Sequence, residues 1–222
     1  MNVARERLLL YAVTDRAWLN STPAGCNTLE RQVEEAVLGG VTLVQIREKQ
    51  LSDADFTAQA RQLKRVTDRL GVPLIVNDNL SVALASDADG LHIGQDDGDV
   101  RLTRGRLGPT KILGVSVQTV EQARAAEADG ADYLGVGAVF PTSTKSDAAE
   151  VSLAALAEIC AAVHVPVVAI GGIHAGNVKA LAGAGLAGVA VVSALFARPE
   201  RVRAAARELR ALAAEVCAPR GA

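Results

Sequence analysis

The chain has 222 residues and lacks several features that would assign it at once to a class of protein. Aromatic residues make up only 3% of it, so its core must be built from aliphatic side chains, as in layered α/β proteins. The formal net charge of −2 argues against the basic surface of a nucleic-acid-binding protein. No run approaches the roughly 18 apolar residues that span a membrane, nor does the N-terminus resemble a cleavable signal. We therefore expect neither a nucleic-acid nor a membrane partner.

Cysteine is also scarce. Cys26, Cys160 and Cys217 are far apart in the sequence and odd in number, and they match no metal-binding or redox spacing. We expect them to be packing residues in a reducing compartment, and we predict a cytoplasmic protein. The sequence is compatible with a homo-oligomer.

The sequence does contain a regular alternation of short apolar runs and helical patterns. Apolar runs of this length between glycine and proline residues are typical of buried strands. The predicted strands cover residues 8–13, 43–46, 74–77, 90–93, 112–115, 133–136, 167–170 and 189–192. The predicted helices cover residues 28–38, 52–70, 80–86, 99–107, 119–128, 152–162, 177–184 and 199–216.

This alternation predicts the fold class. Strands that are apolar throughout are covered on both faces, which favours a parallel sheet. Eight strand–helix units in about the minimum length indicate a single (β/α)8 TIM barrel over residues 1–222. A doubly wound open sheet is the alternative. In both architectures the chemistry takes place at the carboxyl ends of the strands.

Acidic residues follow two consecutive predicted strands. Asp78 comes after residues 74–77 and Asp97 after residues 90–93. If these strands are parallel neighbours, they lie roughly 5 Å apart and the two carboxylates emerge side by side. Such carboxylates repel each other unless a cation lies between them, and Mg²⁺ prefers one or two carboxylates plus substrate phosphates. Either acidic end alone is more typical of a turn, and Asp99 of a helix cap, but the pair favours a magnesium site.

The segment after the second strand carries an amide and two cations. Alternation along a strand places Gln45, Arg47 and Lys49 on one side, toward the barrel mouth. The planar fork of arginine and the point charge of lysine suit an anion. An ordinary charged loop, paired with Asp53 or Asp55, is the alternative interpretation.

Further polar groups follow the later strands. Ser116 ends the fifth strand, Gly172 follows the seventh and lets backbone N–H groups approach a ligand, and Ser193 opens the helix after the eighth. The loop after the sixth strand carries hydroxyls and one cation, which predicts a segment that closes over bound phosphate or a merely flexible loop. Its polar residues are Thr142, Ser143, Thr144, Lys145 and Ser146.

The rim therefore carries two kinds of anion site. Arg47, Lys49 and Lys145, with a metal on the acidic pair, would suit a diphosphate. Backbone groups near Gly172 and Ser193, with the loop hydroxyls, would suit a monophosphate. Because no Ser–His–Asp or Cys–His pairing falls at these ends, the pattern favours metal-assisted displacement of diphosphate by a second, phosphorylated substrate.

These motifs, in this order, resemble those of the thiamine-phosphate synthase (thiamine-phosphate pyrophosphorylase) family, and the match covers nearly the whole chain. They are Gln45-Ile46-Arg47-Glu48-Lys49, Asn77-Asp78, His92-Ile93-Gly94-Gln95-Asp96-Asp97, Gly114-Val115-Ser116, Pro141-Thr142-Ser143-Thr144-Lys145 and Ile170-Gly171-Gly172-Ile173. One departure is Gln118, where the family often has histidine.

The resemblance implies a (β/α)8 barrel and a Mg²⁺-dependent transferase of a pyrimidinylmethyl group. It would join 4-amino-2-methyl-5-(diphosphooxymethyl)pyrimidine to 4-methyl-5-(2-phosphooxyethyl)thiazole, or its carboxy form, giving thiamine phosphate and diphosphate. Diphosphate departure would run ahead of thiazole attack, because the aminopyrimidine can stabilise a cation on its methylene carbon. A related thiazole tautomerase and a non-catalytic phosphate-ligand-binding barrel are the alternatives.

The resemblance also implies roles for individual residues. Those that would hold the pyrimidine diphosphate are Gln45, Ile46, Arg47, Glu48, Lys49, Asn77, Ser116 and Lys145. Those that would hold the thiazole phosphate are Thr142, Ser143, Thr144, Gly172, Val192 and Ser193. The catalytic residues among them would be Lys145, Ser116, Arg47 and Lys49. The Mg²⁺ ligands would be Asp78 and Asp97.

Overall fold

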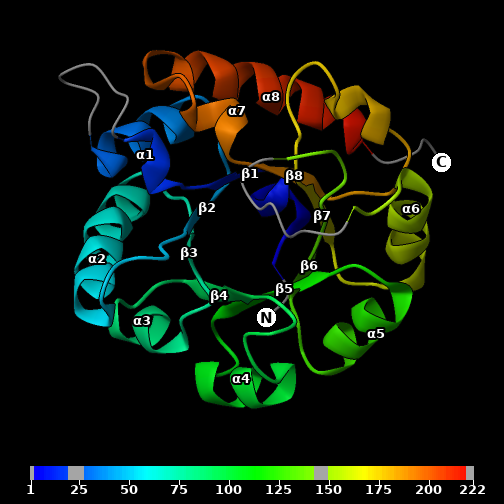
Figure 1. Ribbon diagram of the computed structural model, residues 1–222, viewed down its shortest axis with the longest axis horizontal. Helices are drawn as coiled ribbons and strands as arrows, with labels where there is room; N and C mark the ends of the chain where they lie inside the picture. The colour runs from blue at the N-terminus through cyan, green and yellow to red at the C-terminus, as the bar shows by residue number, and fades with distance from the viewer. Residues whose placement is uncertain (1–2, 20–27, 143–149, 219–222) are drawn as a thin grey trace.

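A computed structural model describes residues 3–19, 28–142 and 150–218. Within these ranges, eight parallel strands close into a barrel in chain order, and the last strand pairs with the first. The strands are β1 (Leu10–Val13), β2 (Leu43–Ile46), β3 (Leu74–Asn77), β4 (Gly90–Ile93), β5 (Ile112–Val117), β6 (Tyr133–Val136), β7 (Val167–Ile170) and β8 (Gly188–Val191). Figure 1 looks down this barrel, with the helices forming an outer ring. The predicted (β/α)8 barrel is confirmed, and the open sheet is wrong.

The helices alternate with the strands. The α-helices are α1 (Leu29–Leu38), α2 (Asp53–Arg69), α3 (Leu80–Ala85), α4 (Val100–Leu107), α5 (Val120–Ala128), α6 (Leu153–Ala162), α7 (Ser193–Phe196) and α8 (Val202–Val216). The 3₁₀ helices are η1 (Arg5–Leu8), η2 (Arg16–Trp18), η3 (Val178–Leu181) and η4 (Pro199–Arg201). Polar side chains cap the first six α-helices by accepting a backbone N–H from the first turn. The capping residues are Thr28, Ser52, Asn79, Asp99, Thr119 and Ser152.

The α-helix predicted over residues 177–184 was wrong, because the chain forms only the short η3 helix there. The side chain of Asn177 does not cap the helix. It donates to the carbonyl of Gly172 at 2.8 Å and accepts the N–H of His174 at 2.8 Å. Gly183 and Gly185 then adopt φ angles of 82° and 88°, which a right-handed helix cannot contain.

Two further element boundaries differ from the prediction. The first strand begins at Leu10 rather than residue 8, since η1 occupies the preceding residues. The last α-helix begins at Val202 rather than residue 199, after η4, and the additional short helix α7 follows β8 directly. The carboxyl ends of the strands lie where the sequence predicted them, except that β5 extends to Val117 and β8 ends one residue earlier, at Val191.

The apolar core has two layers. The larger one lies between the strands and the surrounding helices, and it contains the outward-facing strand residues such as Val44, Ile46 and Leu134. The smaller one fills the barrel with inward-facing residues such as Leu43, Ile75 and Val168. Leu8 of η1 belongs to this interior layer, and η1 lies inside the ring of strands in the view of Figure 1. No helix among the described residues is long and apolar enough to cross a membrane.

Candidate functional site

The carboxyl ends of β3 and β4 bring two aspartates together. Asp78 and Asp97 lie within hydrogen-bond reach of each other. The ammonium group of Lys49, which follows β2, lies 2.5 Å from Oδ2 of Asp78. The sequence predicted this adjacency from the strand order alone, since β2, β3 and β4 are consecutive neighbours in the barrel. One cation and two carboxylates therefore meet at one edge of the barrel mouth.

Local backbone structure holds both aspartates in place. Asp78 has a φ of 62°, a left-handed conformation that aspartate tolerates better than most residues, and its N–H donates to the carbonyl of His92 at 2.8 Å. That bond continues the β3–β4 hydrogen-bond ladder by one residue. Asp97 lies in the turn after β4, where its Oδ2 accepts the N–H of Gly94 at 2.7 Å. Asp99 only caps α4, accepting the N–H of Leu102 at 2.8 Å.

The charge balance of the pair is unfavourable to full ionisation. Partial burial raises the pKa of Asp97, and the neighbouring carboxyl of Asp78 raises it further by hydrogen bonding and by charge. The Gly94 N–H and the Lys49 ammonium act in the opposite direction but do not cancel these effects. Two carboxylates in repulsion are a donor set that fits Mg²⁺, which takes one or two carboxylates and completes its shell with water and substrate phosphates.

The acidic pair lines a cavity of about 210 Å³ between α3 and α4. Leu91 and Ile93 form part of its wall, and Arg106 adds a cation. The described residues hold no group of three or more His, Cys, Asp or Glu side chains that could enclose a metal. A Mg²⁺ ion held by this pair would complete its coordination shell with water and substrate phosphates.

The side chains at the end of β2 and just after it lie in three different environments. Lys49 is exposed and Arg47 is partly exposed. Glu48 turns away, because its nearly buried carboxylate accepts two bonds of 3.1 Å from Nε of Arg16. Ile46 is fully buried in the layer between strands and helices, so its side chain cannot reach a ligand at the mouth.

Gln45 differs from the prediction that it faces the mouth. It is on the inward-facing side of β2, as alternation requires, but it lies within the barrel, 4% exposed, where Nε2 donates to the Tyr11 hydroxyl at 2.5 Å. Among the residues that the structure describes, the two aspartates of the alternative interpretation are bonded to other partners. Asp53 accepts from Asn79, and Asp55 accepts from Ser52.

The end of β5 places Ser116 at the mouth, partly exposed, with Asn77 partly exposed at the end of β3. The Ser116 hydroxyl lies 2.9 Å from Nε2 of His92, and its carbonyl accepts from the Gln95 side chain at 2.7 Å. Gln118, where the family often has histidine, donates to the carbonyl of Gly137 at 3.4 Å. It therefore lies over the neighbouring end of β6.

The opposite part of the rim carries the backbone groups predicted for a monophosphate. Gly172 has a φ of 64°, and a Cβ there would lie 2.4 Å from the Pro141 carbonyl oxygen, so only glycine fits. Val192 is partly exposed, and the exposed Ser193 begins α7. Thr142 is partly exposed after β6. The predicted Ser143, Thr144 and Lys145 lie outside the described residues.

The sequence interpretation missed the polar side chains inside the barrel. Tyr11, Tyr133 and His92 are all buried, and hydrogen bonds connect them with Gln45 and Ser116. The available signal was the strand pattern itself, because alternation turns each of these residues inward.

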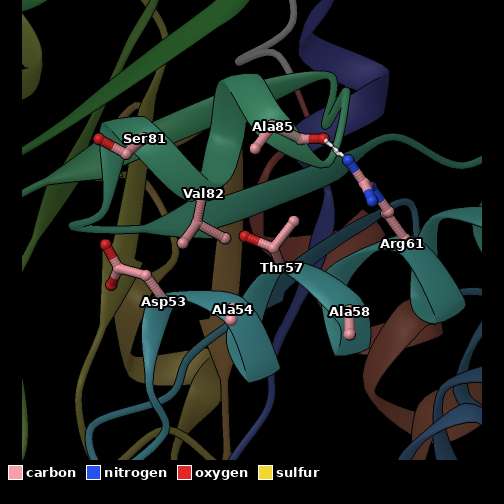
Figure 2. A pocket seen from close by; sticks show the side chains of 8 residues that line it. All are labelled: Asp53, Ala54, Thr57, Ala58, Arg61, Ser81, Val82 and Ala85. Atoms are coloured by element: carbon pink, nitrogen blue, oxygen red, sulfur yellow. Dashed lines mark hydrogen bonds between the residues drawn. The ribbon is translucent and has the colours of Figure 1, made fainter.

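A second cavity, of about 410 Å³, lies outside the barrel between α2 and α3 (Figure 2). Its walls are short side chains, including Ala54, Thr57 and Ser81. Its one arginine, Arg61, is already bound to the carbonyl of Ala85 at 2.7 Å. This cavity is separate from the strand ends, and it gathers none of the predicted site residues.

Comparisons with known proteins agree with this geometry. The sequence model of the family described as thiamine monophosphate synthase matches residues 10–195. The chain is 48% identical over 200 residues to the thiamine-phosphate synthase of Clostridium tetani, covering 90% of this chain and 93% of the relative. It is 49% identical over 192 residues to thiamine-phosphate synthase 2 of Streptococcus pneumoniae serotype 4, covering 86% and 89%. Thiamine phosphate pyrophosphorylase from Pyrococcus furiosus superposes with a TM-score of 0.85 at 38% identity, covering 96% of this chain and 98% of that one.

Proposed function

Because the chain belongs to the thiamine-phosphate synthase family of transferases, we propose that it joins two phosphorylated heterocycles in a Mg²⁺-dependent reaction. The substrates are 4-amino-2-methyl-5-(diphosphooxymethyl)pyrimidine and 4-methyl-5-(2-phosphooxyethyl)thiazole or its carboxy form. The products are thiamine phosphate and diphosphate. The observation that carries this proposal is the meeting of Lys49, Asp78 and Asp97 at one edge of the barrel mouth.

This edge is suited to the leaving group. Asp78 and Asp97 would hold Mg²⁺, which neutralises charge on a diphosphate when it is bound. Lys49 and Arg47 extend from the adjacent strand end and supply positive charge where negative charge grows on the departing oxygen. Lys49 forms an ion pair with Asp78, which keeps its ammonium group beside the carboxylates that would hold the metal.

The remaining rim groups would hold the two rings in line. Ser116 and Asn77 are partly exposed at the ends of β5 and β3, where they would bind polar atoms of the pyrimidine. Gly172, Val192, Ser193 and Thr142 would hold the thiazole phosphate across the mouth. This arrangement keeps the attacking nitrogen near the methylene carbon, so that diphosphate can leave ahead of bond formation.

The remaining roles follow from the family motifs. Lys145 would add charge to the leaving group, and Ser143 and Thr144 would add hydroxyls to the phosphate grip. Ile46 and Glu48 would contribute through the backbone, since their side chains are otherwise engaged. Gln45 would contribute to binding of the pyrimidine diphosphate from within the barrel. A cytoplasmic location stays a prediction.

Diphosphate release on mixing both substrates tests the proposal. Asp97→Asn should lower kcat by at least about a hundred-fold, as expected when transition-state charge loses its partner. Asp96→Asn is the matched control, because Asp96 is an exposed neighbour in the same turn and should remain active. A folded Asp97→Asn protein with full activity would contradict the proposal. Binding of both ligands without turnover would indicate a non-catalytic barrel instead.

A further inference from the structure

A chain of hydrogen bonds crosses the inside of the barrel and ends at the mouth. It begins at Gln45 of β2, passes through Tyr11 of β1 and Tyr133 of β6, and reaches Ser116 of β5 through His92 of β4. We call these five residues the interior chain. Their successive contacts measure 2.5, 2.8, 2.9 and 2.9 Å. Four of the five are less than 9% exposed, and only Ser116 reaches the rim.

The barrel is built to accommodate this chain. A Cβ on Gly114 would lie 2.2 Å from Cζ of Tyr133 and 2.4 Å from Nδ1 of His92. A Cβ on Gly135 would lie 3.1 Å from Cε1 of His92. Two neighbouring strands therefore lack side chains where the tyrosine and the histidine pack, with ring centroids 5.5 Å apart.

The direction of the hydrogen bonds follows from the end of the chain at Gln45. An amide nitrogen can only donate, so Nε2 of Gln45 gives its hydrogen to the Tyr11 oxygen. The hydroxyl hydrogen of Tyr11 then goes to its other partner, the Tyr133 oxygen. Burial raises the pKa values of the Tyr11 and Tyr133 phenols above their ordinary value, so both groups remain O–H donors.

The same direction decides the state of His92. Tyr133 accepts from Tyr11, so it donates its own hydrogen to Nδ1 of His92. A neutral imidazole that accepts at Nδ1 carries its hydrogen on Nε2. With hydrogens on both ring nitrogens, the Tyr133 oxygen would accept from both neighbours and its own hydrogen would lack an acceptor within the chain. Nε2–H therefore donates to Oγ of Ser116.

We propose that the interior chain holds His92 as the Nε2–H tautomer and thereby directs the hydroxyl hydrogen of Ser116 toward the barrel mouth. Because Oγ of Ser116 already accepts from the interior, Ser116 acts as a donor to a lone pair on the ligand, such as a ring nitrogen. His92 and Tyr133 are then positioning residues that act through Ser116. This role in ligand binding rests on the proposed function, whereas the tautomer does not.

The tautomer is measured directly by long-range ¹H–¹⁵N correlation of the protein labelled with ¹⁵N-histidine. The chain has three histidines, and His92→Gln identifies the signal that belongs to His92. The side chain of His164 is 99% exposed, with Nδ1 3.7 Å from a carboxylate oxygen of Glu127, and it serves as an internal reference for a ring at the surface. We expect His92 to show hydrogen on Nε2 alone in the ligand-free protein. Hydrogen on Nδ1, or an average of both tautomers, would overturn the proposal.

Tyr133→Phe tests the consequence for the site. It removes the donor to Nδ1, so the fixed tautomer should be lost and kcat/KM for the pyrimidine diphosphate should fall about five-fold, the typical effect of one neutral hydrogen bond. The KM for the thiazole phosphate should not change. Val168→Ala is the control, because Val168 packs in the same interior layer without a polar group and should keep the tautomer.

The outcomes separate the two proposals. An unchanged tautomer in Tyr133→Phe, or equal losses for both substrates, would contradict the positioning role. A third outcome combines the Nε2–H tautomer in the ligand-free protein with no diphosphate release when both substrates are added. In that case the proposed function is wrong, but the assignment of the His92 tautomer is confirmed.

Discussion

The surroundings of two glycines predict opposite effects on stability when each is replaced by alanine. Gly114→Ala places a methyl group inside the barrel, 2.2 Å from the Tyr133 ring and 2.4 Å from Nδ1 of His92. Gly105→Ala places one on the exposed face of α4, where nothing lies within 4 Å. Neither glycine has a positive φ, so backbone strain does not separate the two substitutions.

The magnitudes follow from these surroundings. Overpacking at Gly114 costs about 1–3 kcal/mol, and each buried polar group that loses its partner when His92 and Tyr133 move costs about 1–3 kcal/mol more. A loss of about 3 kcal/mol lowers Tm by about 6–12 °C in a protein of this size. Alanine in place of an exposed helical glycine gains about 0.5–1 kcal/mol, so Gly105→Ala should raise Tm by about 1–4 °C.

Chemical and thermal unfolding of the three proteins, followed by circular dichroism, gives both changes. The free energy of unfolding should fall for Gly114→Ala and rise for Gly105→Ala, with unchanged dependence on denaturant concentration. Gly114→Ala with the stability of the wild-type protein would refute the reasoning, because the interior chain would then not be packed as the structure describes.

Two further predictions concern charged groups. Because the folded-state pKa of Asp97 is raised, its ionisation costs stability as pH rises through that pKa. Asp97→Asn should therefore exceed the wild-type free energy of unfolding at pH 7 by up to about 1 kcal/mol, a small value for an exposed group, and match it below the pKa of an unfolded aspartate. Equal differences at both pH values would contradict this assignment. Away from the mouth, Arg104 binds the 3%-exposed Asp132 at 2.5 Å, so Arg104→Met should destabilise the fold by about 3–5 kcal/mol in urea titrations, without changing the KM of either substrate. A shift in KM would instead place this ion pair in the site.

The sequence predicted the barrel because its periodicity is strong at every strand. Seven of the eight predicted strands end within one residue of the carboxyl end that the structure shows, as at β2, β3 and β4. The adjacency of Asp78 and Asp97 followed from strand order and the spacing of parallel strands. These features depend on local patterns and on one topological rule, so a single sequence suffices for them.

Other features depended on contacts that periodicity does not encode. The 177–184 segment has the composition of a helix. The side chain of Asn177, however, donates a hydrogen bond to the Gly172 carbonyl instead of capping a helix, and the positive φ angles of Gly183 and Gly185 prevent the helix from continuing. Gln45 was assigned to the mouth because alternation fixes which face of a strand a residue occupies, not its depth in the barrel. The interior chain joins residues from five different strands. Alternation turns each of them inward, but no spacing along the sequence shows which of them form hydrogen bonds with one another.

The most direct test of the central claim is the release of diphosphate by the wild-type protein when both substrates are mixed with and without Mg²⁺. The account predicts diphosphate in amounts equal to the thiamine phosphate formed, and loss of both products when the metal is removed by a chelator. Turnover at an unchanged rate after chelation, or no thiamine phosphate with the metal present, would contradict it.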